Sequence, residues 1–155
     1  MICRYDFATP AYDEAVAIRQ RVLRLPLGLD IADDPLHEEF DQTHFGAFEA
    51  GRLLGTASLV ATGAGALKMR QVAVDADQQG RGIGRALVAA CEAYARRLGA
   101  ERLYCHARDV AVPFYKSCGW RPEGEPFTEV GIEHRILSAP AAHLRPPSQG
   151  ESGGR

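Results

Sequence analysis

Residues 69–85 decide the fold, and they read Met-Arg-Gln-Val-Ala-Val-Asp-Ala-Asp-Gln-Gln-Gly-Arg-Gly-Ile-Gly-Arg. The pattern predicts a strand that runs into glycines, which in turn run directly into a helix. Gly80, Gly82 and Gly84 carry no side chains, so consecutive backbone N–H groups can converge on an anion there. The helix that begins at this point offers unpaired N–H groups and the positive end of its dipole. The stretch therefore predicts a binding site for a phosphate or a pyrophosphate.

Other loop classes fit these glycines less well. A loop whose glycines serve only flexibility is one alternative. It would not explain why the loop leads directly into a helix whose start has no capping side chain. A dinucleotide-binding loop has the pattern G-x-G-x-x-G, but Arg85 or Leu87 stands where its third glycine belongs. Only Glu101 lies near the distance expected of the acidic ribose ligand in such a fold. A nucleotide-triphosphate loop needs a lysine after its glycines, and neither Lys68 nor Lys116 follows one. These exclusions leave a pyrophosphate-binding loop of another class.

The rest of the chain predicts a sheet and three helices. Strands are expected at residues 2–7, 44–49, 52–60, 67–74 and 102–107, with one or two more within 120–137. Helices are expected after the cap Thr9, at 82–98, and at 111–118 behind the cap Asp109. The apolar face of the second helix is expected to hold Leu87, Cys91, Tyr94 and Leu98. This order predicts the α/β class in its α+β form, a mixed sheet with helices on its faces.

Length and composition limit the class of protein. The 155 residues, 46% of them hydrophobic, suit one domain at residues 1–138. Residues 139–155, rich in Pro and Gly, are expected to be a flexible tail. A net charge of −2 argues against nucleic acid as a partner, and no apolar stretch suits a membrane. Four cysteines without C-x-x-C spacing, and no signal sequence, indicate reduced thiols in a cytoplasmic protein. The five histidines form no pair at zinc-ligand spacing, so no metal is expected.

Three motifs resemble the GNAT superfamily of N-acetyltransferases. Gln79-Gly-Arg-Gly-Ile-Gly84 matches the Q/R-x-x-G-x-G/A loop that cradles the pyrophosphate of acetyl-coenzyme A in that family. Phe114-Tyr-Lys-Ser-Cys-Gly-Trp120 resembles the family's F-Y-x-x-x-G-F segment, with Trp120 in place of the usual Phe. Phe127-x-Glu-x-Gly-Ile-x-His134 is similar to the ending of an ElaA-like branch. The resemblance covers about residues 15–137 and implies the GNAT fold, a mixed, mainly antiparallel sheet flanked by helices.

The resemblance also implies where acetyl-coenzyme A binds. Residues 71–74 are similar to the family's splayed strand, whose main chain pairs with the pantetheine arm, and a backbone N–H of Ala73 or Val74 is implied as the oxyanion donor. The implied coenzyme-binding residues come from this strand, the loop and the helix start: Val72, Ala73, Val74, Gln79, Gly80, Arg81, Gly82, Ile83, Gly84 and Arg85. Arg81 and Arg85 are expected nearest to the phosphates.

Transfer of an acetyl group from a thioester to an amine makes three chemical demands. A lysine-like amine, with a pKa of about 10.4 in water, must lose a proton before it attacks. The developing oxyanion needs preorganised donors, and the leaving thiolate benefits from a proton. The resemblance places Tyr115 beside the coenzyme sulfur, where its protonated phenol can donate, although a packed aromatic is the alternative.

Candidates for the base are His106, His134 and Glu129, although a structural role is the favoured alternative for each of them. The resemblance to the ElaA-like ending favours Glu129 and His134 as pocket residues. His44 could face the same pocket or be a histidine at a strand edge. Residues 30–49 hold seven acids and no Lys or Arg, which suits either a cationic acceptor or a solvated face.

We therefore expect an enzyme that transfers acetyl from acetyl-coenzyme A to a primary amine, of a small molecule or a peptide, by direct attack in a ternary complex. The alternatives are a non-catalytic module that binds or senses acyl-coenzyme A, and an oxidoreductase with a nucleotide cofactor. The sequence leaves open which amine is the acceptor and whether the chain forms the homodimer that is common in the superfamily.

Overall fold

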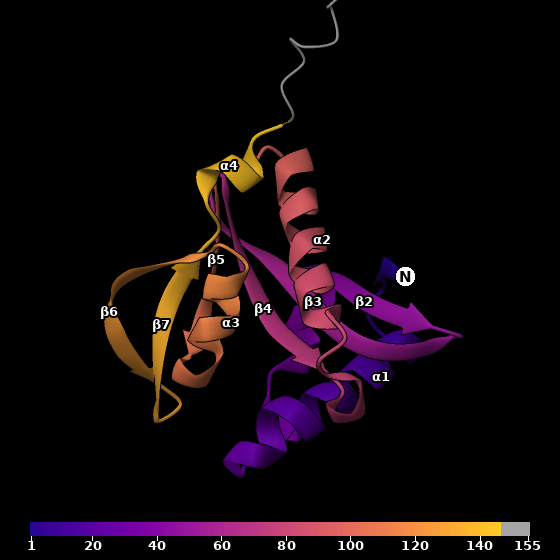
Figure 1. Ribbon diagram of the computed structural model, residues 1–155. Coiled ribbons are helices and arrows are strands. Elements are labelled where there is room, and N and C mark those ends of the chain that lie inside the picture. The colour runs from indigo at the N-terminus through magenta and orange to yellow at the C-terminus, as the bar shows by residue number, and fades with distance from the viewer. Residues whose placement is uncertain (147–155) are drawn as a thin grey trace, which may run out of the picture.

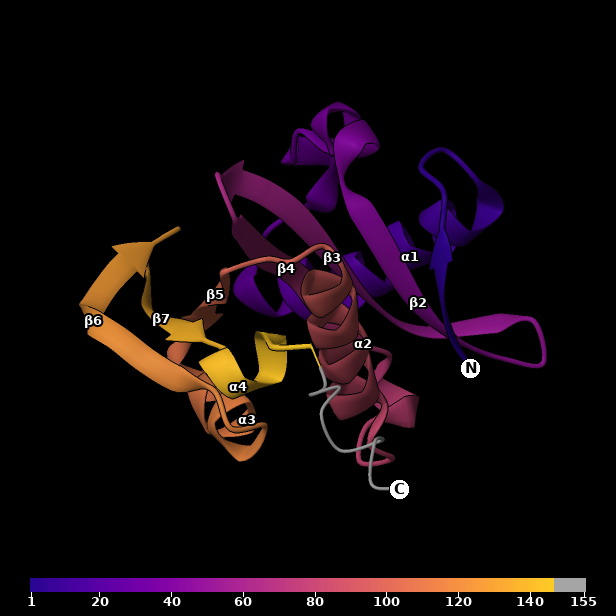
Figure 2. The ribbon, with the colours of Figure 1, turned by 90° about the horizontal axis from the view of Figure 1, so that it is seen from above.

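The computed structural model describes residues 1–146 and shows a seven-stranded sheet with helices on both faces (Figures 1 and 2). The strands lie in the order β1-β2-β3-β4-β5-β7-β6. Only β4 and β5 are parallel, and the other neighbours are antiparallel. The predicted mixed, mainly antiparallel sheet is therefore confirmed. The strand bounds are β1 Ile2–Tyr5, β2 Thr43–Glu49, β3 Arg52–Gly63, β4 Ala66–Val74, β5 Arg102–Arg108, β6 Arg121–Glu129 and β7 Ile132–Ser138.

Four α-helices and several short helical turns lie between these strands or, in the case of α4, after the last one. The helices are α1 Pro10–Arg19, α2 Ile83–Arg97, α3 Val112–Ser117 and α4 Ala141–Leu144. A π-helical turn, η1 (Gln20–Arg24), continues α1, and the 3₁₀ turns are η2 Leu25–Leu27, η3 Ile31–Asp33, η4 Leu36–Asp41, η5 Ala76–Gln78 and η6 Asp109–Ala111. π-helical turns are rare and often lie at functional sites, and η1 supplies Leu23 and Arg24 to the cavities described below.

Two apolar clusters fix the helices to the sheet. The larger cluster packs α2, through residues such as Leu87 and Cys91, against Phe45 of β2 and Met69 of β4. The smaller one packs Ala15 and Ile18 of α1 against Leu53 and Ala73. Figure 1 shows α2 in front of the strands and α1 behind them. A sheet covered on both faces by amphipathic helices buries apolar surface from each side, which is the main favourable term in folding.

The sheet opens between its two parallel strands. β4 and β5 are paired at only three positions, from Ala66 opposite Arg102 to Lys68 opposite Tyr104. Beyond these positions β4 pairs only with β3, and β5 only with β7, so the two strands splay apart. A β-bulge lies on the open side, because Ala57 of β3 faces both Gln71 and Val72, and Gln71 takes a φ of +56°. The splay and the bulge together shape the edge of a cleft.

The structure confirms most of the predicted elements and corrects some details. Thr9 caps α1 with its hydroxyl, which accepts from the N–H of Tyr12 at 3.4 Å. Leu98 is wrongly predicted as part of the buried face, because it lies past the end of α2 and is 57% exposed. Asp109 is not the cap of α3, since it begins the turn η6 and α3 has no capping side chain. The strand predicted at 52–60 continues to Gly63.

The beginning of the predicted tail packs against the domain. Leu144 of α4 is buried, and the carbonyl of His143 accepts from Arg96 of α2 at 2.9 Å. The Glu92 carboxylate of α2 also accepts from His143 Nδ1 and, at 3.0 Å, from Trp120 Nε1. The remainder of that predicted tail, 147–155, lies outside the described residues.

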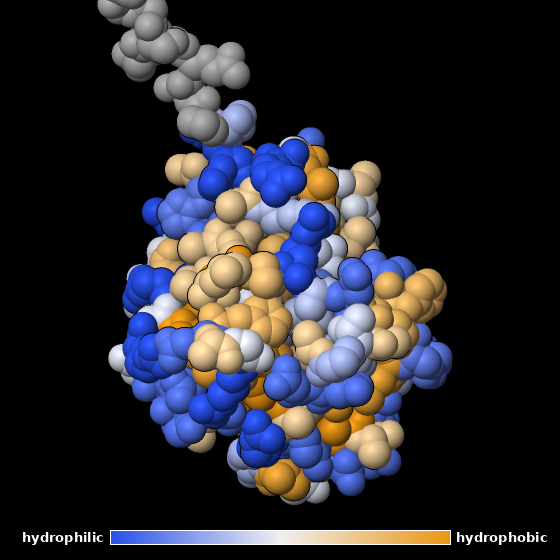
Figure 3. All heavy atoms as spheres, turned by 90° about the vertical axis from the view of Figure 1, so that its right-hand side faces the viewer, coloured by the Kyte–Doolittle hydropathy of each residue, from blue (hydrophilic) through white to orange (hydrophobic). Residues whose placement is uncertain are grey.

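Figure 3 faces the edge of the sheet that carries β1 and β2. On this face hydrophilic and apolar side chains are interspersed.

Within residues 1–146, no helix is both long and apolar enough to cross a membrane.

Candidate active site

Two adjoining cavities occupy the cleft where β4 and β5 splay. The first, of about 540 Å³, lies over the glycine loop and the start of α2, and we call it the loop cavity. The second, of about 380 Å³, lies between the middle of β4, the end of β5 and the turn that joins β6 to β7, and we call it the sheet cavity. Val72, Arg108 and Tyr115 are among the residues that line both cavities. Two ligands could therefore meet at these residues.

The glycine loop has the geometry expected of an anion site. Gly80 and Gly82 have φ values of +84° and +82°, in the left-handed region that favours glycine. Gly82 is the N-cap of α2 and no side chain caps that end, so the first N–H groups of the helix are left for a ligand. A Cβ at Gly84 would lie 3.3 Å from Cζ of Phe114, so glycine allows α2 and α3 to approach closely. The residues present thus fit the pyrophosphate of a coenzyme.

The structure brings nearly all the predicted coenzyme-binding residues to one wall. The loop cavity is lined by Val72, Ala73, Val74, Gln79, Gly80, Gly82, Ile83, Gly84 and Arg85. Gln79 donates from Nε2 to the carbonyl oxygen of Val74 at 3.1 Å, which ties the loop to the strand. Arg85 donates to the carbonyl and the hydroxyl of Ser117 at 3.0 and 2.9 Å.

Arg81 is placed differently from the other predicted coenzyme-binding residues. Its side chain does not line the loop cavity. Its guanidinium instead donates to Glu49 Oε2 at 2.8 Å and to the side-chain oxygen of Gln78. Because the sequence separation between Arg81 and Glu49 is large, the motif alone could not foresee this ion pair. The Arg81 side chain therefore faces Glu49 rather than the loop cavity.

Tyr115 stands where the two cavities meet. Its side chain is buried, and its ring packs against Phe114 and Trp120 with centroids 5.0 and 5.5 Å away. Burial, reinforced by the neighbouring thiols of Cys105, Cys91 and Cys118, raises the pKa of Tyr115 well above its usual value. The phenol therefore stays protonated at neutral pH.

The three candidate bases form one cluster in the sheet cavity. β5, β7 and β6 are neighbours, and their register sets His134 opposite both Arg108 and Phe127. Because side chains two residues apart on a strand share a face, His106, Glu129 and His134 converge there. Glu129 Oε1 lies 3.1 Å from His106 Nδ1, and Oε2 lies 3.7 Å from His134 Nε2. All three line the sheet cavity.

Neighbouring groups determine the ionisation of Glu129 and the ring nitrogen through which each histidine of this cluster donates. Burial acts to raise the pKa of Glu129, but the hydrogen bond from His106 and the charges of His106, Lys68 and His134 outweigh it and lower that pKa. An ionised carboxylate only accepts hydrogen bonds, so Nδ1 of His106 is the donor and Nε2 of the neutral ring carries the lone pair. His134 Nδ1 lies 2.8 Å from the carbonyl of Ile132 and donates to it.

Among residues 1–146, no group of three His, Cys, Asp or Glu side chains could hold a metal ion.

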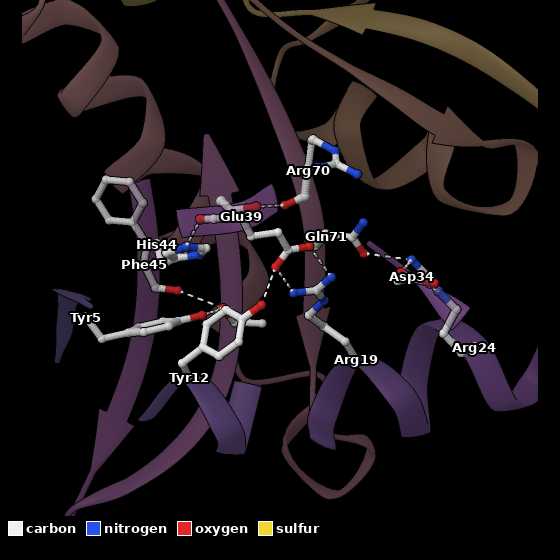
Figure 4. Close-up of polar contacts among 12 residues, drawn as sticks. Tyr5, Tyr12, Arg19, Arg24, Asp34, Glu39, His44, Phe45, Arg70 and Gln71 are labelled. Carbon is white, nitrogen blue, oxygen red and sulfur yellow. Dashed lines mark hydrogen bonds and ion pairs between the residues drawn. The ribbon is translucent and has the colours of Figure 1, made fainter. Parts of the chain in front are cut away.

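Sequence reasoning missed the opposite wall of the sheet cavity. Arg24 of η1 donates to Asp34 Oδ2 at 2.7 Å and to Gln71 Oε1 at 3.2 Å (Figure 4). All three side chains line the cavity. Neither the π-helical turn that carries Arg24 nor the left-handed backbone of Gln71 leaves a residue pattern in the sequence. These contacts could be found only from the folded chain.

Three of the seven acids between residues 30 and 49 pair with arginines, and of these only Glu39 is buried. Glu39 receives two hydrogen bonds of 2.8 Å from Arg19 and one of 2.7 Å from Tyr12, and all three side chains are buried (Figure 4). Asp34 and Glu49 pair with Arg24 and Arg81. Asp33, Glu38 and Asp41 are exposed. The segment is therefore not a uniformly solvated face, although five of its seven acids are exposed, namely Asp30, Asp33, Glu38, Asp41 and Glu49.

His44 lies outside both cavities. Its ring is buried between Tyr5 and Tyr12, with centroids 5.4 Å from each, and its Nε2 lies 3.0 Å from the carbonyl oxygen of Glu39. Burial lowers the pKa of His44 despite that hydrogen bond. The suggestion that His44 faces the pocket is therefore wrong. It packs against α1 and η4 instead.

Comparison with known proteins agrees with this geometry. Residues 27–136 match the family described as the acetyltransferase (GNAT) domain, and the chain belongs to this family. It is 26% identical over 138 residues to the uncharacterized N-acetyltransferase YitI of Bacillus subtilis, a match that covers 85% of this chain and 93% of YitI. The fold is that of N-acetyltransferases.

Solved structures share the whole architecture. Escherichia coli ElaA superposes with a TM-score of 0.72 at 17% identity, covering 88% of this chain and 99% of ElaA. An aminoglycoside 6′-N-acetyltransferase, solved with coenzyme A, superposes with a TM-score of 0.73 at 14% identity, covering 90% and 96% of the two chains. At these identities the likeness is one of fold.

Proposed function

We propose that the protein transfers the acetyl group of acetyl-coenzyme A to a primary amine, by direct attack of the amine within a ternary complex. The observation that carries this proposal is the position of Tyr115. Its phenol lies between a cavity built over the glycine loop and a cavity lined by the His106–Glu129–His134 cluster. A donor thioester and an acceptor amine could meet at this point.

The loop cavity would hold the donor. The N–H groups at residues 80–84 would donate hydrogen bonds to the pyrophosphate oxygens, assisted by the positive end of the α2 dipole. The splay leaves β4 without a partner on its cleft side from about Arg70 to Val74, so its main chain could pair with the pantetheine arm. A backbone N–H of Ala73 or Val74 would then stabilise the oxygen that becomes negative during attack.

The residues of the sheet cavity would bind the acceptor and remove a proton from its ammonium group. His106, held by Glu129 through Nδ1, would take a proton from the ammonium group at Nε2, directly or through a water molecule. The neutral amine nitrogen would then bond to the acetyl carbon as the carbon–sulfur bond breaks. Tyr115 would give its phenolic proton to the departing thiolate and would be reprotonated, directly or through water, by the second proton that the nitrogen loses as the amide forms. The first proton, held by His106, would return to solvent.

The environment of Cys105 favours direct attack by the amine over a route through an acetylated cysteine. It lines the sheet cavity, whereas Cys3, Cys91 and Cys118 line neither cavity, so Cys105 is the candidate for a covalent relay. Burial raises the pKa of Cys105 to about 12, so the nucleophilic thiolate is scarce at neutral pH. The amine itself is then the nucleophile.

The experiment that tests this proposal replaces Tyr115. Tyr115→Phe should lower kcat for acetyl transfer at neutral pH by about 100-fold or more, while calorimetry shows coenzyme A binding within about threefold of wild type. Tyr104→Phe is the matched control, since Tyr104 lines neither cavity and its hydroxyl bonds Thr62 at 3.0 Å. Unchanged turnover in Tyr115→Phe would remove Tyr115 from the mechanism.

Binding measurements separate the alternatives. A sensor of acyl-coenzyme A would bind it but release no free thiol with any amine in a panel. An oxidoreductase would be protected from heat by NAD rather than by coenzyme A. The cluster of three titratable side chains in the sheet cavity favours the enzyme, because a sensor has no use for a base. A cytoplasmic location and a homodimer stay predictions from the sequence.

A further inference from the structure

The sheet cavity carries more positive than negative charge. Its lining holds four basic residues, Arg24, Lys68, Arg70 and Arg108, and two acidic ones, Asp34 and Glu129. Asp34 is occupied by Arg24, and Glu129 by His106. Within residues 1–146, the side chains of Lys68, Arg70 and Arg108 form no ion pair and donate no hydrogen bond to the protein.

Lys68 and Arg70 act as one group. They lie two residues apart on β4 and therefore point to the same face of the strand, just before the bulge at Gln71. Both are half-buried. The charge of Arg70 helps to lower the pKa of Glu39, but that carboxylate is already bound by Arg19 and Tyr12. In Figure 4 the Arg70 side chain points away from the Glu39 carboxylate.

The coenzyme does not account for these two charges. Its phosphates would lie on the glycine loop, which lines the other cavity, and neither Lys68 nor Arg70 lines that cavity. Two half-buried cations at the acceptor side favour an anionic group on the acceptor, because a cleft of one charge sign concentrates the opposite charge. The planar guanidinium of Arg70 is suited to a carboxylate.

We propose, building on the proposed acetyl transfer, that the acceptor is a small amine that also carries a carboxylate and an apolar body. Lys68 and Arg70 bind the carboxylate. Leu23, Leu27, Leu29 and Val130, which also line the sheet cavity, contact the apolar body. Leu27 and Leu29 are each 36% exposed and Val130 is 68% exposed, so apolar surface is available at the rim. Hydrophobic amino acids have this combination of groups.

This charge pattern also bears on the reacting nitrogen. Nearby cations disfavour the protonated form of a bound amine, which lowers the pKa of the ammonium and helps its deprotonation. The same field opposes acceptors that carry two or more positive charges. Polyamines are therefore expected to be poor substrates, although the acidic composition of residues 30–49 would suggest the opposite.

Matched acceptors test the proposal. Leucine, phenylalanine and methionine are compared with the same molecules lacking the carboxylate, 3-methylbutylamine, 2-phenylethylamine and 3-(methylthio)propylamine, and with 1,5-diaminopentane as the dication. Initial rates are measured as thiol release from acetyl-coenzyme A. At least one amino acid should exceed its decarboxylated counterpart in kcat/KM by roughly 10- to 100-fold, as expected for charge-assisted hydrogen bonds. The diamine should be the poorest acceptor.

Variants assign the effect to the two side chains. Arg70→Gln should raise KM for the preferred amino acid about tenfold or more and leave KM for the decarboxylated amine nearly unchanged. Lys68→Gln tests the same prediction from the second cation, in case Arg70→Gln disturbs the bulge. Arg121→Gln, at an exposed position on β6, is the matched control and should change neither value.

The outcomes separate this inference from the proposed function. Equal kcat/KM values within all three pairs, or a preference for the diamine, would overturn the carboxylate inference and leave acetyl transfer intact. Loss of turnover on both members of a pair in Arg70→Gln would also overturn it, since carboxylate binding predicts a selective loss. No thiol release with any of the amines would contradict the acetyl transfer itself.

Discussion

His106 Nδ1 lies 3.1 Å from Glu129 Oε1, and this contact links β5 to the end of β6 across the intervening strand β7. The two residues are 23 positions apart in the sequence and meet only because the sheet order places β7 between their strands. A carboxylate in this position fixes the orientation of the imidazole and leaves its other nitrogen for the amine.

Removal of the Glu129 charge should slow acetyl transfer. Glu129→Gln keeps a side chain of similar size but no longer holds the imidazolium that forms when His106 takes a proton, so kcat should fall by about 10- to 100-fold. Steady-state thiol release across pH 5–9 measures the effect. Glu133→Gln, at an exposed position on β7, is the control. A rate equal to that of wild type would show that the contact between His106 and Glu129 serves only the fold.

The conformation of Gly82 should matter for coenzyme affinity. Gly82→Ala places a Cβ on a backbone at φ +82°, which costs about 1–2 kcal/mol, although no protein atom lies within 4 Å of that Cβ. Relaxation of this strain should turn the first N–H groups of α2 and weaken coenzyme A binding about tenfold in calorimetry. Gly63→Ala is matched, because a Cβ there also meets open space but the backbone needs no left-handed φ. Equal affinity in both variants would argue against the loop as the pyrophosphate site.

Cys105 should be dispensable for turnover. Because its thiol stays protonated and the proposed attack is direct, Cys105→Ala should keep kcat within about threefold of wild type. Intact-mass spectrometry after incubation with acetyl-coenzyme A alone should show no acetylated protein. A stable acetyl adduct that disappears in Cys105→Ala, together with loss of turnover, would indicate a covalent route instead.

The buried pair of Arg19 and Glu39 should dominate the stability of the N-terminal half. Glu39→Gln leaves the Arg19 charge buried without its partner, so unfolding free energy should fall by roughly 3–5 kcal/mol in urea denaturation. Glu38→Gln changes an exposed neighbour of the same type and should have an effect below about 0.5 kcal/mol. Similar stabilities of the two variants would show that the pair contributes little.

The same pair should give the stability a defined pH dependence. Burial acts to raise the pKa of Glu39, but the hydrogen bonds and charge of Arg19 outweigh it and lower that pKa. The contribution is therefore complete above the unfolded-state pKa, about 4.3, and is lost as the pH falls through the lower pKa of the folded state. The stability difference between wild type and Glu39→Gln should shrink over this acidic range. A difference that stays constant down to pH 2 would contradict the assignment.

Local features of this fold could be predicted from the sequence alone. The strand, glycines and helix of residues 69–97 follow from neighbouring residues, since Gly82 sets the backbone and the apolar spacing sets the buried face of α2. Tyr115 was located by its motif, and the structure places it at the junction of the two cavities. The sequence predicts His106, Glu129 and His134 as three separate candidates, but it does not predict that they converge.

The remaining features depend on contacts between distant parts of the chain. Arg81 was expected at the phosphates, but Glu49, 32 residues earlier, holds its side chain. Three of the seven acids of residues 30–49, Glu39, Asp34 and Glu49, pair with Arg19, Arg24 and Arg81, and no local pattern encodes that pairing. The bulge at Gln71 likewise arises from the register of β3 against β4.

A crystal structure with coenzyme A bound would test the central claim most directly. We predict the pyrophosphate against the backbone N–H groups of residues 80–84, the pantetheine arm along β4, and the sulfur within hydrogen-bonding reach of the Tyr115 hydroxyl. The sulfur should point toward the His106–Glu129–His134 cluster. Coenzyme A bound away from the glycine loop, or with its sulfur remote from Tyr115, would contradict the proposed active site.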